Sequence, residues 1–164
     1  AAEAYIQSAF EFKDGVSSER RLGFMLCELA GLRFEQKNYA EAEQIYLRAK
    51  AIFEKLQQRN HVVLADHGLG LVWTQLKRYD DARTVLFRVL DEYRWNHNTY
   101  GVADISYALG RCEMLAGNVR AALTFLRTAH GLAYQLDPSP ARDYLLHWIQ
   151  AWLKRGQSGE FGTV

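Results

Sequence analysis

The side chains that could do acid–base, metal or nucleophilic chemistry are few and scattered along this chain. Five histidines and two cysteines are present, with no His-x3-His or Cys-x2-Cys spacing to hold a metal ion on one element. The histidines are His61, His67, His97, His130 and His147. The sequence therefore predicts no metal site and no cofactor.

Two short stretches resemble pieces of catalytic motifs. Asp66-His67 has the residue types of a general base and its orienting carboxylate, but we expect a polar pair on a helix face. Gly68-Leu69-Gly70 lies within a helical pattern, so close helix packing explains Gly70 better than phosphate binding does. No Gly-x-Ser-x-Gly elbow or P-loop occurs. We expect that the chain is not an enzyme.

Composition narrows the class of partner. The net charge is +1 and charges of both signs alternate along the expected helices, which argues against direct nucleic-acid binding. No apolar stretch approaches the ~20 residues that cross a bilayer, so we expect no membrane contact. Cys27 and Cys112 are expected to be small buried side chains, which favours a reducing, cytoplasmic setting. The partner left by these exclusions is a protein or a peptide.

The elements that position these residues follow a pattern that returns every forty residues. Small side chains recur in three rows, and larger apolar side chains recur in two. The small rows are Ala30/Gly70/Gly110, Ala42/Ala82/Ala122 and Ala49/Val89/Ala129; the large rows are Leu29/Leu69/Leu109 and Tyr46/Leu86/Leu126. Helices pack closely only where facing positions lack bulk, so each unit is predicted to be a helix, a tight turn and a second helix.

Polar breaks separate the predicted helices. Short breaks are expected within each unit, at Lys37-Asn38, Lys77-Arg78 and Gly117-Asn118. Longer breaks are expected between units, around Arg59-Asn60, Asn96–Asn98 and Asp137–Pro140, and Asn and Gly suit them because both tolerate left-handed backbone.

This spacing resembles the tetratricopeptide repeat, in a long-helix variety of about forty residues rather than thirty-four. The middle unit matches best, through Leu69, Gly70, Trp73, Tyr79, Ala82 and Leu86. Arg33 and Glu113 stand where the first and third units should carry the second aromatic residue. The resemblance implies an all-α fold, a right-handed superhelical solenoid of antiparallel helix pairs.

The predicted organisation is one repeat domain over residues 1–156 followed by a tail, 157–164. Within it we expect a half-unit at 1–15, units at about 20–58, 60–96 and 99–137, and a terminal helix at 139–155. The start in the register of a second helix suggests a piece of a longer protein; the alternative is a complete array with single capping helices. Unstacked faces at the half-units predict possible self-association.

In the resembled family the first helix of each unit lines a concave groove. Carried across, the partner-binding positions are Phe24, Phe34, His67, Leu71, Thr74, Asp104, Tyr107, Arg111 and Met114. Cys27, Gly31 and Leu64 share these faces, with Glu35, Gln75 and Leu115 at their flanks. Trp148 and Trp152 are expected to pack onto the preceding unit. Tyr107, Arg111 and His67 are expected to centre binding of an acidic peptide with one apolar anchor.

These features predict a non-catalytic scaffold or adaptor that binds protein or peptide through the groove. The alternative is the sensor or oligomerisation domain of a signal-responsive regulator, such as a transcription activator or a peptide-sensing regulator. The sequence of neighbouring segments in a full-length protein would separate the two.

Overall fold

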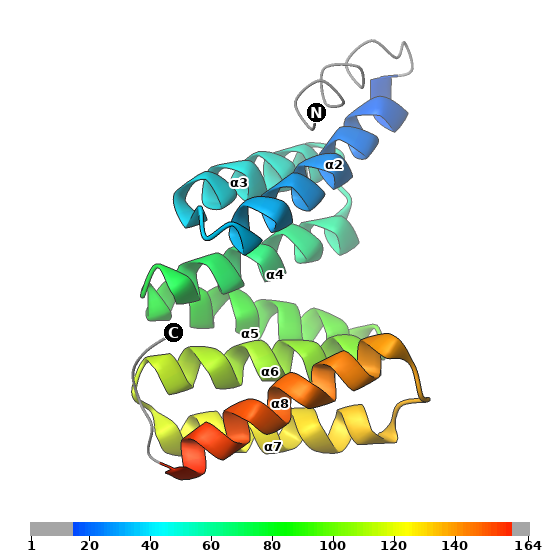
Figure 1. Ribbon diagram of the computed structural model, residues 1–164. Coiled ribbons are helices and arrows are strands. Elements are labelled where there is room, and N and C mark those ends of the chain that lie inside the picture. Colours follow the sequence, from blue (N-terminus) through cyan, green and yellow to red (C-terminus); the bar gives the residue numbers. More distant parts are fainter. Residues whose placement is uncertain (1–14, 159–164) are drawn as a thin grey trace. The chain divides into compact units, whose positions relative to one another are not determined.

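The computed structural model describes residues 15–158, which form seven helices and no strand. In chain order the helices are α2 (Gly15–Glu35), α3 (Tyr39–Lys55), α4 (Arg59–Gln75), α5 (Tyr79–Trp95), α6 (Thr99–Leu115), α7 (Val119–Gln135) and α8 (Pro140–Ser158) (Figure 1). The prediction of an all-α fold is confirmed for these residues. The expected half-unit at 1–15 and most of the expected tail lie outside the described residues.

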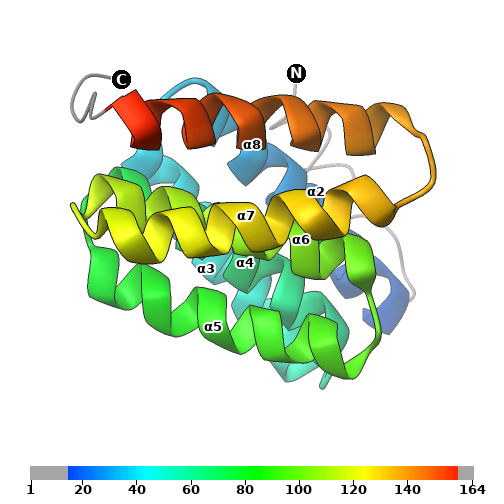
Figure 2. The same cartoon turned by 90° about the horizontal axis from the view of Figure 1, so that it is seen from below.

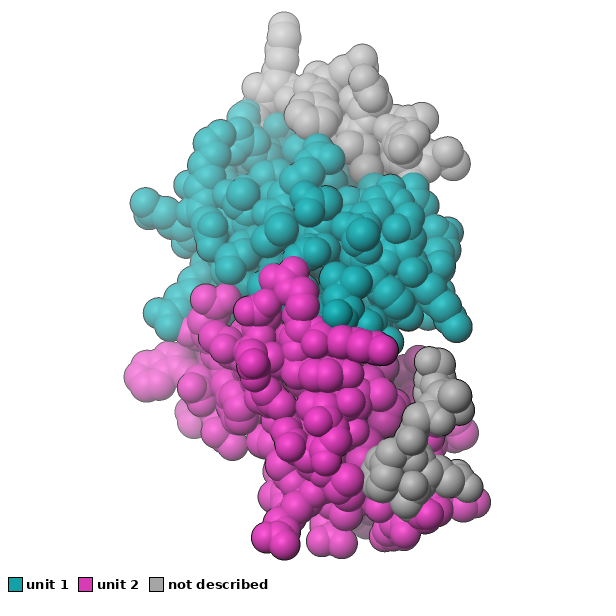
Figure 3. All heavy atoms as spheres, turned by 90° about the vertical axis from the view of Figure 1, so that its left-hand side faces the viewer, with its two compact units in different colours: residues 1–76 teal, residues 77–164 magenta. Residues whose placement is uncertain are grey.

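The chain divides into two compact units, residues 1–76 and residues 77–164 (Figure 3). In unit 1, α3 packs against both α2 and α4, and α2 also contacts α4. In unit 2, α6 packs against α5 and α7, while α8 packs against α7 and also contacts α6 (Figures 1 and 2). Consecutive helices therefore pack as neighbours within each unit, which is a helical-repeat architecture.

The turns have a finer period than the forty-residue unit. Helices α3 to α7 each contain 17 residues, and three residues separate each of them from the next. The middle residue of every three-residue turn has a positive φ. A residue with left-handed backbone therefore recurs every twenty positions. These residues are Lys37, Gln57, Lys77, His97 and Gly117. The forty-residue repeat is thus built from two equal steps.

Backbone hydrogen bonds explain why each turn is so short. After α2, the N–H of Asn38 donates to the carbonyl of Arg33 at 2.9 Å, and the N–H of Lys37 donates to the carbonyl of Phe34 at 2.8 Å. This pair of bonds is a Schellman motif, which satisfies the last carbonyls of a helix and needs one left-handed residue. The same two bonds recur after α3, α5 and α6.

Two expectations about the connections are wrong. The break expected around Arg59-Asn60 lies at residues 56–58, and both it and the break at 96–98 are as short as those within units. Only the connection from Gln135 to Pro140 is longer. Asparagine does not occupy the left-handed positions; it follows them, and Asn98 accepts a hydrogen bond from the N–H of Gly101 as the N-cap of α6.

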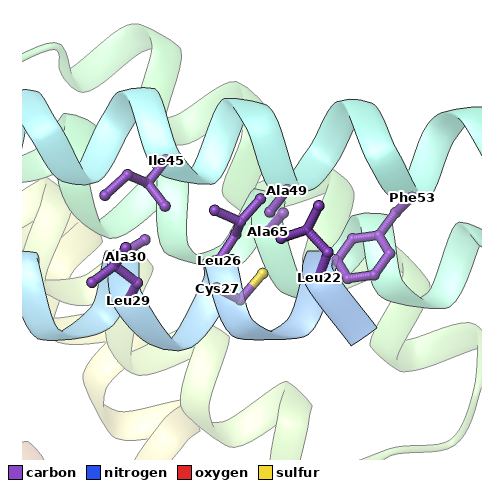
Figure 4. Close-up of a cluster of buried hydrophobic side chains, with 9 residues drawn as sticks. All are labelled: Leu22, Leu26, Cys27, Leu29, Ala30, Ile45, Ala49, Phe53 and Ala65. Atoms are coloured by element: carbon purple, nitrogen blue, oxygen red, sulfur yellow. The ribbon is translucent and has the colours of Figure 1, made fainter. Parts of the chain in front are cut away.

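Burial confirms the predicted packing rows, except that Tyr46 is only half-buried. Every alanine and valine of the small rows is fully buried, and the row of Leu29, Leu69 and Leu109 is at most 8% exposed. At Gly110 a β-carbon would lie 2.7 Å from Cγ of Leu126 and 3.3 Å from the backbone oxygen of Ala122, so only glycine allows α6 and α7 this close. Figure 4 shows the corresponding core of unit 1, where Leu26, Ile45 and Ala49 meet between α2 and α3.

The residues that depart from the repeat pattern are satisfied by partners. Arg33 pairs with Glu41 at 2.9 Å, and Glu113 accepts from Nε of Arg83 at 2.6 Å. Trp73, the aromatic residue of the middle unit, donates from its indole nitrogen to Glu43 at 2.7 Å. The non-aromatic residues at Arg33 and Glu113 therefore take part in polar contacts between helices.

Three pairs of residues lie at equivalent positions of the repeat, forty residues apart, and each pair makes a different kind of contact. Glu43 with Trp73 joins α3 to α4 by a hydrogen bond, and Arg83 with Glu113 joins α5 to α6 by an ion pair. Forty residues on, the matching positions are Leu123 and Leu153, half-buried side chains that pack on one apolar cluster between α7 and α8. The repeat specifies that these positions meet, and the residue types set how they interact.

Among residues 15–158, no helix is both long enough and apolar enough to cross a membrane. Both cysteines are buried free thiols, as predicted.

Candidate functional site

The candidate site is a pocket of about 280 Å³ within unit 1. Its walls come from α2, α3 and α4, and it is lined by Phe24, Cys27, Glu28, Tyr46, Leu64, His67, Gly68 and Leu71. Three of the predicted groove residues, Phe24, His67 and Leu71, are thereby brought together. Most of the lining is apolar, with one carboxylate and one imidazole at its edge. A concave apolar surface with a few polar groups is typical of binding sites.

Gly68 shapes this pocket. A β-carbon at Gly68 would lie 2.2 Å from the ring of Tyr46, so the missing side chain lets that ring lie flat against α4. Tyr46 then forms the floor between the two first helices, α2 and α4. Close packing at a glycine was predicted for Gly70 rather than Gly68. The sequence does contain a signal for this packing. In the row Tyr46/Leu86/Leu126 the first unit has a tyrosine where the other two have a leucine, and Gly68 faces that tyrosine.

Two side chains that line the pocket, Cys27 and Tyr46, have raised pKa values. Burial raises the pKa of the Cys27 thiol to about 12, and the neighbouring Glu28 carboxylate adds to this rise. Burial also raises the pKa of Tyr46 to about 12, with further contributions from Cys27 and the Glu35 carboxylate. Cys27 is therefore an un-ionised, unreactive thiol at neutral pH. Within the described part of the chain, neither Glu28 nor Glu35 forms an ion pair.

Phe24 is anchored rather than free. Its ring lies 5.3 Å from the ring of Phe53 and 4.6 Å from the ring of His61, both in edge-on geometry. Gly23 makes room for this cluster, because a β-carbon there would lie 2.6 Å from Phe53. One wall of the pocket is thus held by the aromatic core of unit 1.

The matching surface of unit 2 is filled. The guanidinium carbon of Arg111 lies 5.5 Å from the ring centre of Tyr107 and 5.6 Å from that of Trp152, which comes from α8. Trp152 is only 8% exposed and packs with Met114 and Leu126. Arg111 is therefore held between two aromatic rings by cation–π contacts. Glu113, on the same helix, is bound instead by Arg83 and Asn118.

Not every predicted groove residue is accessible. Thr74 is 3% exposed and donates its hydroxyl to the carbonyl of Gly70, and Met114 is 5% exposed beneath Trp152. The expectation that these two side chains line an open surface is therefore wrong. Thr74 is turned into its own helix, and the residues of α8 cover Met114. Asp104 is half-buried, as is Phe34, whose ring lies 5.4 Å from that of Tyr39.

The two tryptophans of α8 have different environments. Trp152 packs on the preceding helices, as predicted, whereas Trp148 remains 41% exposed beside Tyr144 and His147. His67 belongs to unit 1, and Tyr107 and Arg111 belong to unit 2. The expected binding trio of His67, Tyr107 and Arg111 therefore stays a prediction.

No cluster of metal-ligating side chains is found in residues 15–158, since no group of three or more His, Cys, Asp or Glu side chains there is placed to hold an ion. Asp66 is 2% exposed and lies 3.0 Å from the ammonium group of Lys50, so it joins α3 to α4 as a buried ion pair. The Asp66 carboxylate thus contributes to the contact between α3 and α4.

A second hollow, of about 460 Å³, lies at the C-terminal end of α5 in unit 2. Its lining, Asp91, Arg94, Trp95 and His97, comes from one helix end and its turn. Trp95 is 82% exposed. Among the described residues its lining comes from this one helix end, so it is a weaker candidate than the pocket of unit 1, which three helices line.

The sequence matches no protein-family model and no curated protein.

Proposed function

We propose that this chain is a non-catalytic binding domain that holds a peptide or protein segment in a groove formed by its first helices. The observation that carries the proposal is the pocket of unit 1, which opens between α2 and α4 and exposes apolar side chains next to Glu28 and His67. Its volume is at the lower limit for drug-sized ligands, so it suits one or two side chains of a larger partner. The proposed class is an adaptor or scaffold.

The proposal includes a tetratricopeptide-like solenoid with a right-handed superhelical twist. It is supported by the forty-residue register, the buried rows of small side chains and the pairing of neighbouring helices. In such a solenoid the first helices of successive units share one face, as α2 and α4 do at the pocket of unit 1.

An unbiased peptide selection tests this function. Random peptides displayed on phage are selected on the purified chain, and their affinities are measured by fluorescence anisotropy. Leu64→Gln alters the pocket, and Tyr144→Gln is the matched control at the same register position of α8; both side chains are exposed. We expect Leu64→Gln to weaken binding about tenfold, because an apolar contact is lost. Enrichment of no peptide, or equal effects of both variants, would contradict the proposal.

The second candidate is an oligomerisation or sensor domain of a regulator. It is favoured by the exposed rings on α8, where Tyr144 is 68% exposed and Trp148 is 41% exposed. Sedimentation velocity over a range of concentrations tests it, with Trp148→Gln as the variant. Concentration-dependent association that this variant abolishes would support oligomerisation; a monomer at every concentration would reject it.

A further inference from the structure

The pocket of unit 1 occupies the place in the repeat that unit 2 fills with its own side chains. Helices α2, α3 and α4 correspond to α6, α7 and α8, at a spacing of eighty residues. Burial supports this register, because Ala65 and Leu69 of α4 match Leu145 and Ile149 of α8, and all four are buried. The two sets of helices can therefore be compared position by position.

The comparison shows which side chains are missing from unit 1. Three residues form the cation–π stack of unit 2, and each has a much smaller counterpart in unit 1. Tyr107 corresponds to Cys27, Arg111 to Gly31, and Trp152 to Val72. Helix geometry is retained while an aromatic ring, a guanidinium group and an indole are absent. Of these three positions, Cys27 lines the pocket, a β-carbon at Gly31 would lie 3.7 Å from the Tyr46 hydroxyl, and Val72 is fully buried. The small residues at Cys27 and Gly31 therefore leave room beside Tyr46.

The charge around the space is complementary to the missing cation. Glu28 lines the pocket and stands where unit 2 has Ala108, so unit 1 has a carboxylate where unit 2 has none. The Glu35 carboxylate, on the same helix as Glu28, adds to the rise in the pKa of Tyr46. Neither carboxylate forms an ion pair within residues 15–158. An unpaired carboxylate beside an aromatic wall is a suitable environment for a guanidinium group.

We propose that the pocket of unit 1 receives an arginine side chain, with a neighbouring aromatic side chain, from a partner peptide. The guanidinium would lie against Tyr46 with Glu28 as its counter-ion, and the aromatic ring would contact Leu64 and Leu71. The peptide thereby supplies to unit 1 the groups that Tyr107 and Arg111 supply within unit 2. This inference rests on the proposed function and specifies its ligand. It differs from the acidic peptide expected from the sequence, because Arg111 is already held between two rings.

The test uses defined peptides and a variant that fills the pocket from within. The probes are fluorescein-labelled helical peptides containing Tyr-x-x-x-Arg, the spacing of Tyr107 and Arg111, in a background of Ala, Gln and Ser. Matched probes carry citrulline or Glu in place of Arg. Gly31→Arg is designed to bring a guanidinium to the pocket from beside Tyr46, and there is room for the side chain, because a β-carbon at Gly31 would lie 3.7 Å from the Tyr46 hydroxyl. Gly131→Arg is the control, since nothing lies within 4 Å of that helical position.

We expect the wild-type chain to prefer the Arg peptide to the citrulline peptide by about fivefold, the size of one exposed ion pair. Gly31→Arg should weaken binding at least about tenfold, and Gly131→Arg should leave it unchanged. Glu28→Arg, on the surface, should reverse the preference toward the Glu peptide. Circular dichroism and thermal melting of each variant separate lost binding from lost folding.

Two results would overturn the inference. One is equal binding of the Arg and Glu peptides by the wild-type chain; the other is unchanged binding by a folded Gly31→Arg variant. If the unbiased selection still enriches peptides that Leu64→Gln weakens, the binding function stands and only the ligand chemistry is wrong. If that selection enriches nothing, both fail.

Discussion

The two units place the same three helices in the same register and end with opposite surfaces. In unit 1, small residues at Cys27 and Gly31 leave room beside Tyr46, and Cys27 and Tyr46 both line the open pocket. In unit 2, large residues at the corresponding positions close that space, and Leu126 replaces the tyrosine. A repeat therefore determines the positions of helices, while a few substitutions decide whether the surface between them is open or filled.

The comparison also indicates which surface stabilises the fold and which one is suited to binding. A filled surface contributes to the core, as Trp152 does with Met114 and Leu126, and such contacts stabilise the fold. An open pocket leaves apolar side chains in water, which gives up that stabilisation and is typical of a binding surface. We therefore expect substitutions in unit 2 to alter stability most, and substitutions in the unit 1 pocket to alter binding most.

The largest predicted effect is a loss of stability when the filled surface of unit 2 is opened. Trp152→Ala should lower the free energy of unfolding by roughly 3 kcal/mol, because it removes a buried indole and leaves a cavity. Urea unfolding followed by circular dichroism measures it. Trp148→Ala is the control one turn away; its side chain is 41% exposed, so a loss below about 1 kcal/mol is expected. Equal losses would show that Trp152 does not carry the packing between α8 and α6.

The second prediction concerns the polar pairs that replace one another in the repeat. Arg83→Leu should cost roughly 2 kcal/mol, because Glu113 is buried and would retain only Asn118 as a side-chain partner. Adding Glu113→Leu should restore most of the stability, since the corresponding pair, Leu123 and Leu153, is apolar. Chemical denaturation of Arg83→Leu, Glu113→Leu and the double variant completes a double-mutant cycle. A double variant less stable than Arg83→Leu alone would contradict the equivalence of these pairs.

The third prediction concerns the residues with positive φ that occur in the turns of both units. Gln57→Gly should raise the free energy of unfolding by about 0.5–1 kcal/mol, because a side chain at φ 54° is strained. Gly117→Ala should lower it by about 1 kcal/mol at φ 85°. Thermal melting of both variants shows the opposite signs. Shifts of the same sign would mean that the turns do not set these helix ends.

The smallest effect concerns the ionisation of Tyr46. Its pKa in the folded chain is raised to about 12 from 10, so the unfolded chain loses the phenol proton first as the pH rises. The stabilisation is complete below pH 10 and declines as the pH rises toward 12. Tyr46→Phe should therefore reduce the loss of stability between pH 10 and pH 12, as measured by urea unfolding at each pH. An unchanged alkaline slope would indicate that Tyr46 is more exposed than its packing against Gly68 implies.

Much of the fold could be read from the sequence because it follows from spacing. The rows of small and large apolar residues recur every forty positions, and burial confirms them at Ala42, Ala82 and Ala122. Helices that pack side by side need small residues at fixed intervals, so this information is local and periodic. The turns were harder to predict, since Lys37, Gln57 and His97 adopt a conformation that their residue types disfavour.

The candidate site could be predicted only in part. Phe24, His67 and Leu71 were identified by register and do line one pocket, whereas Thr74 and Met114, which were expected on the same helix faces, are buried. Register specifies the face of a helix on which a residue lies. It does not specify what a neighbouring helix places over that face.

The sequence by itself determined an all-α repeat, its register and the face of each helix that is buried, because these depend on residue spacing along one chain. Only the tertiary structure decided that Tyr46 lies against Gly68, that Trp152 covers Met114, and that one unit is open where the other is closed. Those outcomes depend on side chains from three helices meeting in one volume. Whether that volume is filled depends on the sum of their sizes, which no single helix reveals.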